Sequence, residues 1–160
     1  MEAIILAGGM GTRLKKVVPN LPKPMAPIKN KPFLEILIQN LKKLEFTSVI
    51  ISVGYKAEKI INYFGASYEG LSIKYSFEEY PLGTGGALKK AFRLCTNSFV
   101  FVCNGDTFVE FSSYEILKLS KKNKYPIVLG IEVSDTTRYS RLILKNKSLI
   151  GFTDKGLFGK

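Results

Sequence analysis

A glycine-rich segment near the amino terminus has the residue types needed to bind a polyphosphate. Gly8-Gly9-Met10-Gly11-Thr12-Arg13 combines three glycines with a hydroxyl and a guanidinium. Because glycines lack side chains, their backbone N–H groups can converge on an anion. The spacing is neither GxGxxG nor GxxxxGK(S/T), which disfavours a Rossmann dinucleotide site and a Walker loop. An ordinary tight turn after a strand is an equally good interpretation of the segment on its own.

Lys23 lies between two prolines, in Pro22-Lys23-Pro24. Proline restricts its own backbone and that of the residue before it, so the segment is stiff on both sides of the lysine. A lysine held in this way is unusual. The alternative is an extended surface segment with a solvated lysine.

Asp106 is the candidate metal ligand. It follows the apolar run 98–103 and is preceded by Asn104-Gly105, so its carboxylate is expected at the carboxyl edge of a sheet. Mg²⁺ is commonly bound by one or two carboxylates together with substrate phosphates, so a single well-placed aspartate suffices. Alternatively, Asp106 caps the turn that follows it.

Glu78 and Glu79 precede a second glycine-rich segment, Pro81-Leu82-Gly83-Thr84-Gly85-Gly86. A carboxylate can accept two parallel hydrogen bonds from the N1–H and N2–H₂ edge of guanine. Neither adenine nor a pyrimidine presents that pair of donors. A solvated acidic pair at the end of a strand is the competing interpretation.

The chain has no histidine and only two cysteines, Cys95 and Cys103. A histidine-dependent Ser or Cys triad is therefore impossible, and zinc sites built on Cys and His spacing are excluded. We expect Cys103 to be a small buried strand residue. Catalysis is left to Asp, Glu, Lys, Arg, backbone amides and a hard metal ion.

The net charge of +11 raises the possibility of a polyanionic partner. The densest basic cluster, Lys121-Lys122-Asn123-Lys124, is expected at a helix carboxyl terminus, where cations complement the helix dipole. The aromatic residues fall mostly inside apolar segments and do not interleave with basic ones as stacking platforms would. We therefore expect no nucleic-acid partner, and a basic nucleic-acid-binding domain is the less favoured alternative.

Hydrophobic periodicity predicts that strands and helices alternate along the chain. Continuous apolar or β-branched runs indicate buried strands, and apolar residues three and four apart indicate helices. The expected strands are 3–7, 47–53, 72–77, 98–103 and 126–133, the expected helices are 33–44, 57–64, 87–94 and 113–122, and 141–144 is expected to form a hairpin with 148–152.

This alternation predicts an α/β fold with a doubly wound, mostly parallel sheet, and the 160 residues fit one domain. In such sheets ligands bind outside the carboxyl ends of the strands, so we expect the two glycine-rich segments and Asn104-Gly105-Asp106 to converge there. No apolar run approaches the length that crosses a bilayer, and the first residues do not resemble an export signal. We therefore expect a cytoplasmic protein with no membrane partner.

Taken together, these motifs resemble a known family. Leu6-Ala7-Gly8-Gly9-Met10-Gly11-Thr12-Arg13-Leu14 followed by Pro22-Lys23-Pro24-Met25 resembles the signature of the sugar-1-phosphate nucleotidyltransferases. The segments 81–86 and 104–107 match further family motifs in the right order. Within the family, Lys23-Pro24-Met25-Ala26-Pro27-Ile28 and Asn104-Gly105-Asp106-Thr107-Phe108 are most similar to the bacterial D-glycero-α-D-manno-heptose 1-phosphate guanylyltransferases.

The resemblance implies a Rossmann-like nucleotidyltransferase fold and a Mg²⁺-assisted reaction. An oxygen of a sugar 1-phosphate attacks the α-phosphorus of a nucleoside triphosphate, which gives pyrophosphate and a nucleotide sugar for surface polysaccharide synthesis. GTP is the implied nucleotide, and heptose 1-phosphate or mannose 1-phosphate the implied sugar. The implied roles are catalysis by Arg13 and Lys23, nucleotide binding by Leu6, Ala7, Gly8, Gly9, Met10, Gly11, Thr12, Glu78, Pro81, Gly83 and Thr84, a sugar-phosphate side at Asn104 and Gly105, and metal binding by Asp106.

Family members continue past residue 160, through strands that form most of the sugar pocket and supply a second metal-binding aspartate. We therefore expect residues 1–160 to be the nucleotide-binding portion of one domain, with weak nucleotide binding and slow or no turnover unless another chain completes the site. The alternative is a binding module that kept the loops but lost turnover. An unfinished sheet edge would also be a site for homo-oligomer formation.

Overall fold

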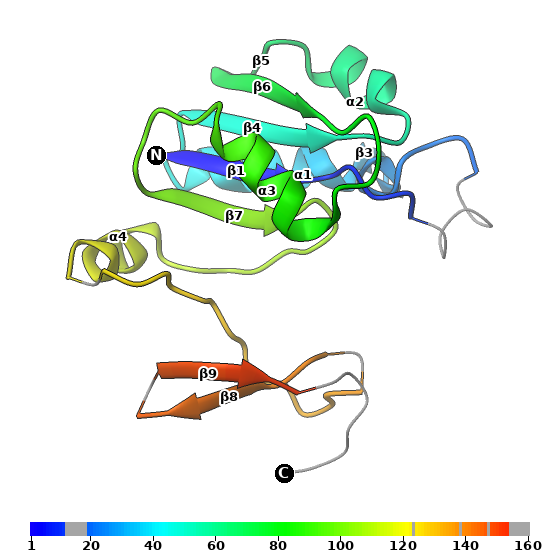
Figure 1. The fold of residues 1–160 in the computed structure, drawn as a ribbon. Helices are drawn as coiled ribbons and strands as arrows, with labels where there is room; N and C mark the ends of the chain where they lie inside the picture. Colours follow the sequence, from blue (N-terminus) through cyan, green and yellow to red (C-terminus); the bar gives the residue numbers. More distant parts are fainter. Residues whose placement is uncertain (12–18, 123, 138, 147, 154–160) are drawn as a thin grey trace. The chain divides into compact units, whose positions relative to one another are not determined.

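A computed structural model describes residues 1–11, 19–122, 124–137, 139–146 and 148–153 (Figure 1). The chain divides into two compact units, Met1–Ser113 and Tyr114–Lys160, each of which is described by itself. Every residue predicted for the candidate site lies in the first unit.

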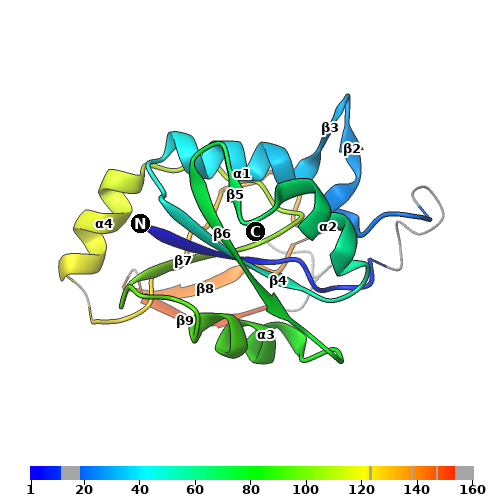
Figure 2. The ribbon, with the colours of Figure 1, turned by 90° about the horizontal axis from the view of Figure 1, so that it is seen from above.

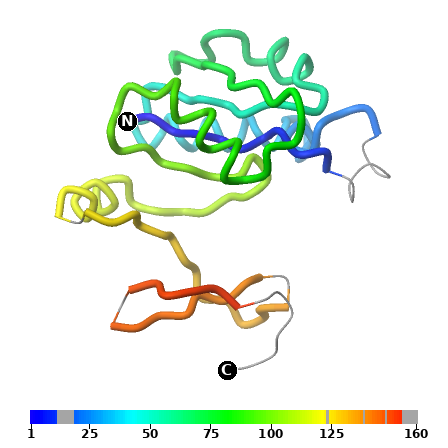
Figure 3. Tube along the Cα trace, viewed as in Figure 1, coloured from blue at the N-terminus to red at the C-terminus, as the bar shows by residue number. Residues whose placement is uncertain are grey.

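The first unit is built on a five-stranded sheet with the strand order β5-β6-β4-β1-β7. β1, β4, β6 and β7 run parallel, with Ile4 of β1 opposite Ile50 of β4 and Val102 of β7, and their common direction can be followed along the trace in Figure 3. The strands are β1 (Glu2–Leu6), β4 (Ser48–Val53), β5 (Ser67–Tyr68), β6 (Leu71–Phe77) and β7 (Val100–Asn104). The predicted parallel sheet is confirmed, and the short antiparallel strand β5 is an addition to it.

Helices cover both faces of this sheet (Figure 2). α1 (Phe33–Lys43) and α2 (Ala57–Phe64) lie on one face, and α3 (Gly83–Phe92) lies on the other. Residues of β1 alternate between the two cores: Ala3 and Ile5 pack with the α1 and α2 side chains, whereas Ile4 packs with Ala91 of α3. Because strands buried on both faces need apolar residues at every position, the continuously apolar runs identified this architecture correctly.

The strand order reverses at β1. From β1 the chain builds outward through β4 and β6, and then returns to place β7 on the other side of β1. Loops that leave neighbouring strands for opposite faces of a sheet open a crevice at such a switch point, and ligands of doubly wound folds bind there. The carboxyl ends of β1 and β7 are therefore the expected centre of a site.

Three short elements between β1 and α1 were not predicted. They are η1 (Lys23–Met25), a single 3₁₀ turn, and the two-residue strands β2 (Pro27–Ile28) and β3 (Lys31–Pro32), which pair antiparallel. Two-residue strands have no hydrophobic period to detect. The hairpin places Phe33 so that its N–H donates to the Ala26 carbonyl at 3.0 Å, which joins η1 to the start of α1.

α3 begins at Gly83, four residues earlier than the sequence indicated. The residues 83–86, predicted to be a loop, form its first turn. Glycine is disfavoured inside a helix, but the N–H groups of a first turn have no intrahelical acceptor and the cost of glycine there is small. The segment between β6 and α3 is correspondingly shorter than expected.

The second unit contains a helix and a hairpin. α4 (Ser113–Lys122) starts at the junction with the first unit, and β8 (Leu142–Lys145) pairs antiparallel with β9 (Ser148–Phe152), as predicted. The strand expected over residues 126–133 is wrong, because these residues form no regular structure. A β-branched run becomes a strand only when a neighbour supplies hydrogen bonds, and no described strand pairs with this one.

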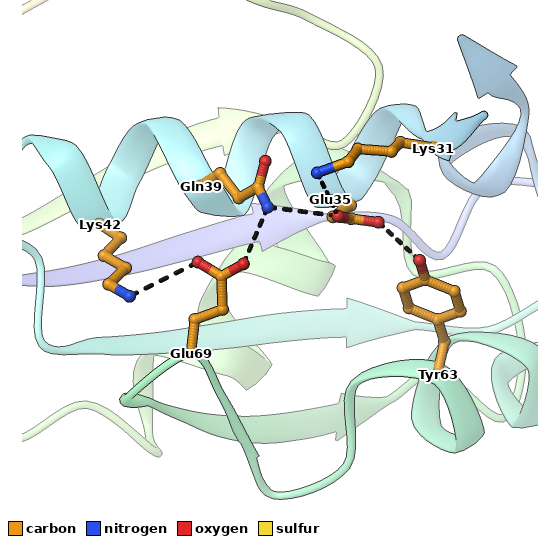
Figure 4. Close-up of polar contacts among 6 residues, drawn as sticks. All are labelled: Lys31, Glu35, Gln39, Lys42, Tyr63 and Glu69. Atoms are coloured by element: carbon orange, nitrogen blue, oxygen red, sulfur yellow. Dashed lines mark hydrogen bonds and ion pairs between the residues drawn. The ribbon is translucent and has the colours of Figure 1, made fainter. Parts of the chain in front are cut away.

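A buried carboxylate joins three parts of the first unit (Figure 4). Glu35 on α1 is 4% exposed and accepts hydrogen bonds from Tyr63 Oη at 2.5 Å and Gln39 Nε2 at 3.2 Å, while Lys31 Nζ of β3 lies 3.1 Å away. Gln39 Nε2 also donates to Glu69, in the turn between β5 and β6, at 2.9 Å. The hydrogen bond from Tyr63 lowers the pKa of Glu35 below its usual 4.5, outweighing the opposite effect of burial.

We expect Tyr63→Phe to lower the free energy of unfolding by about 1–2 kcal/mol at pH 7, because Glu35 loses a donor to its charged form. The contribution of Glu35 is present above its unfolded-state pKa and is lost as the pH falls through the lowered pKa of the folded state. The variant and the parent should therefore converge in stability in strong acid. Urea denaturation across this pH range measures the difference, with Tyr80→Phe, at an exposed position, as the control. An equal loss at all pH values would contradict this role.

Candidate functional site

The loops at the carboxyl edge of the sheet are tied to one another by backbone hydrogen bonds. Gly105 N–H donates to the Leu6 carbonyl at 2.8 Å, and Ala7 N–H donates to the Ser52 carbonyl at 2.9 Å. Tyr55 N–H, beyond β4, donates to the Gly8 carbonyl at 3.3 Å. The ends of β7, β1 and β4 are thus held together, which brings the first glycine-rich segment and Asn104-Gly105-Asp106 to the same edge of the sheet.

Lys23 and Asp106 form an ion pair although 83 residues separate them in the sequence. η1 holds the lysine: Pro22 and Pro24 are buried, and the Pro22 carbonyl accepts a hydrogen bond from Met25 N–H at 2.8 Å. The two charged side chains remain 37% and 34% exposed. Lys23 is therefore paired in a fixed turn, rather than solvated on an extended segment, and both charges remain accessible to a ligand.

Gly105 lets the Asp106 turn approach η1 closely. A Cβ at residue 105 would lie 3.1 Å from Pro24 Cγ and 3.2 Å from Ala7 Cβ, tighter than ordinary contacts. The missing side chain thus allows β7 to deliver Asp106 to Lys23.

The first glycine-rich segment lies directly against Lys23. Gly11 has a φ of +56°, in the left-handed region that favours glycine, and a Cβ there would lie 2.8 Å from Lys23 Cβ. The predicted residues Thr12 and Arg13 lie outside the described residues. Within the described residues, the glycine-rich segment contacts Lys23 at Gly11.

Glu78 occupies the other end of the same segment. A Cβ on Gly8 would overlap the Glu78 carboxylate, so the glycine makes room for it. Glu78 Oε1 accepts a hydrogen bond from Ser52 Oγ at 2.9 Å, and Oε2 accepts a longer one from Leu82 N–H at 3.4 Å. Glu78 is half-buried and Glu79 is exposed, so the two carboxylates do not form a solvated pair.

The remaining predicted residues divide between buried and exposed positions. Ala7 is 2% exposed and could reach a ligand only through its backbone, whereas Leu6 is half-buried and its side chain packs against the α3 core. The exposed ones are Gly9 and Met10 in the loop, Pro81, Gly83 and Thr84 around the start of α3, and Asn104 at the end of β7.

Ser52 was not singled out from the sequence. The only indication would have been a hydroxyl within the otherwise apolar β4 run Val-Ile-Ile-Ser-Val. Buried serines also occur in strands for packing reasons, so that indication is weak without the contact to Glu78.

The described residues contain no group of three or more His, Cys, Asp or Glu side chains placed to hold a metal ion. Asp106 supplies one hard, accessible oxygen donor beside a cation. This arrangement fits Mg²⁺ only if oxygens of a bound phosphate complete the coordination. Cys103 is no alternative ligand, because burial raises the pKa of its thiol to about 12.

The chain matches the family model for nucleotidyl transferases over residues 2–147. The chain belongs to the nucleotidyl transferase family. It is 46% identical to D-glycero-alpha-D-manno-heptose 1-phosphate guanylyltransferase of Aneurinibacillus thermoaerophilus, over 98% of this chain and 68% of that protein. It is 43% identical to the protein of the same name in Campylobacter jejuni, over 100% of this chain and 71% of that protein.

A solved structure agrees with this assignment. The crystal structure of HddC from Yersinia pseudotuberculosis complexed with GMP-PN superposes with a TM-score of 0.82 at 34% identity, over 98% of this nucleotidyl transferase and 70% of that chain. The family and the fold class predicted from the motifs are both confirmed. In the part of the chain that the structure describes, no helix is long and apolar enough to span a membrane.

We expect Gly8→Ala in this nucleotidyl transferase to weaken nucleoside triphosphate binding about tenfold, because the new methyl group must displace Glu78 or the loop. Gly85→Ala is the matched control, since a Cβ at residue 85 would meet no atom within 4 Å and this glycine has no role in the proposed site. Calorimetric titration of both variants measures the effect. Equal affinities would show that the close approach at Gly8 has no role in binding.

Proposed function

We propose that the protein transfers a guanylyl group from GTP to D-glycero-α-D-manno-heptose 1-phosphate, releasing pyrophosphate. The observation that carries this proposal is the 46% and 43% identity, over nearly the whole chain, to two proteins named for that activity. The proposal includes the cytoplasm as the compartment and surface polysaccharide synthesis as the use of the product.

The phosphates are proposed to bind between the glycine loop and the Lys23–Asp106 pair. A phosphate oxygen of the sugar 1-phosphate attacks the α-phosphorus in line, and the bond to pyrophosphate breaks with its electron pair staying on the leaving group. The reaction needs positioning and stabilisation of negative charge, which Lys23 and backbone N–H groups can supply without any histidine.

Asp106 is proposed to hold a Mg²⁺ ion together with phosphate oxygens. Such an ion, when bound, polarises a phosphoryl oxygen and offsets the charge that builds up during transfer. Because Lys23 pairs with Asp106, the Lys23 ammonium group would lie close to phosphates bound beside the Asp106 carboxylate. Arg13 is proposed to hold the β- and γ-phosphates, and Asn104 and Gly105 to face the sugar phosphate.

Glu78 is proposed to read the base. An ionised carboxylate has about four lone-pair sites, of which Ser52 and Leu82 N–H occupy two. Two remain for guanine N1–H and N2–H₂, and Gly83 and Thr84 at the start of α3 would contact the same base. Adenine presents an acceptor at N1 and would leave the carboxylate partly unsatisfied.

We expect calorimetric titration with GTP, ATP, CTP, UTP and dTTP, each with Mg²⁺, to show clear preference for GTP. Arg13→Ala should weaken GTP binding about tenfold or more, since a charge-assisted contact to phosphate is lost. Equal affinity for all five nucleotides would contradict the guanylyl assignment. Unchanged GTP binding by the variant would contradict the role of Arg13.

Transfer is tested by incubating the protein with GTP, Mg²⁺ and either heptose 1-phosphate or mannose 1-phosphate, and detecting the nucleotide sugar by mass spectrometry. We expect the heptose product to form slowly, in line with the slow turnover expected of residues 1–160, and we expect Lys23→Ala to reduce its rate by about 100-fold, the loss typical of one charge-stabilising group. Lys59→Ala, an exposed lysine on α2, is the control. A mannose product alone would reassign the sugar.

A further inference from the structure

Ser52 is a buried hydroxyl inside an apolar strand. Its residue is 0% exposed, and its neighbours in β4, Ile51 and Val53, belong to the hydrophobic core. Burying a hydroxyl is unfavourable unless it is hydrogen-bonded. Its Oγ donates to Glu78 Oε1, at 2.9 Å.

Ser52 also occupies a central place in the sheet. β4 lies between β6, which ends next to Glu78, and β1, which leads into the glycine loop. The Ser52 side chain donates a hydrogen bond to the Glu78 carboxylate. The Ser52 backbone carbonyl accepts one from the N–H of Ala7, the residue that precedes the glycine loop. One residue therefore sets the position of the carboxylate relative to the loop that packs on it at Gly8.

We propose that Ser52 is a positioning residue for base recognition. Ser52 on β4 donates a hydrogen bond to Glu78 Oε1, and Leu82 N–H at the start of α3 donates one to Glu78 Oε2. These two bonds orient the remaining lone pairs of Glu78 to accept hydrogen bonds from guanine. The inference rests on the proposed function, because it presupposes that Glu78 reads guanine.

The chain supplies a matched control in Ser76. It lies opposite Ser52 in the β4–β6 register, is 3% exposed, and its Oγ has no hydrogen-bond partner among the residues that the structure describes. Replacing either serine by alanine removes the same buried oxygen from adjacent strands, but only Ser52 contacts Glu78.

The experiment compares the dissociation constants of GTP, ITP and ATP, with Mg²⁺, for the parent, Ser52→Ala and Ser76→Ala. ITP differs from GTP only in lacking the 2-amino group, so general loosening of the phosphate site weakens both alike. We expect the parent to prefer GTP over both analogues. In Ser52→Ala that preference should fall about five- to tenfold, the net effect of one ordinary hydrogen bond, because Ser52 acts on the base only through Glu78. In Ser76→Ala it should not change.

Four results would overturn the inference. If the folded Ser52→Ala protein keeps the parent's preference, Ser52 does not position Glu78, and the proposed guanylyl function stands. If Ser76→Ala loses the preference equally, the effect is structural. If the parent itself shows no preference for GTP, the base assignment in the proposed function fails as well. If thermal denaturation shows that Ser52→Ala is unfolded, Ser52→Cys takes its place, because the thiol has the same shape, is slightly larger and is only a weak donor. Full preference for GTP in that variant would equally overturn the inference.

Discussion

The close approach of backbone and carboxylate around Gly8 is the constraint on which the site depends. The Gly8 carbonyl accepts a hydrogen bond from Tyr55 N–H, and a Cβ on Gly54 would lie 2.9 Å from the oxygen of that carbonyl. The Glu78 carboxylate occupies the space that a side chain at residue 8 would fill. These contacts join the ends of β1, β4 and β6. The glycine loop is therefore fixed in place at its start, and its course over Lys23 follows from there.

Charge at the site is arranged along the strand order. Moving across the edge from β6 to β7, one meets Glu78, then the glycine loop after β1, then Asp106. Lys23 is supplied from η1 and is paired with Asp106, at the β7 end. Each charge of that pair offsets the other while the side chains stay about one-third exposed, so a phosphate or a metal ion can enter without displacing a buried pair. Glu78 is instead held by neutral donors.

Much of this arrangement could be predicted from the sequence, because buried parallel strands leave continuous apolar runs and their loops must share one edge. Lys23 and Asp106 were each predicted from local chemistry, but their pairing depends on β7 lying beside β1, a neighbour relation that no local pattern encodes. The start of α3 was misplaced because glycine argues against helix wherever it occurs, yet its cost is small in a first turn. Ser52 was missed since its significance lies in a contact with a residue 26 positions away.

The layout separates two tasks on one edge of the sheet. Residues proposed to act on phosphate come from β1, η1 and β7, whereas those proposed to read the base come from β4, β6 and the start of α3. The glycine loop contacts both groups, through Gly8 at one end and Gly11 at the other. Base preference can then change through Ser52, Glu78 or the α3 turn without moving Lys23 or Asp106. A change at Gly8 or Gly11, by contrast, displaces the loop from Glu78 or from Lys23, and glycine is required at those two positions for that reason.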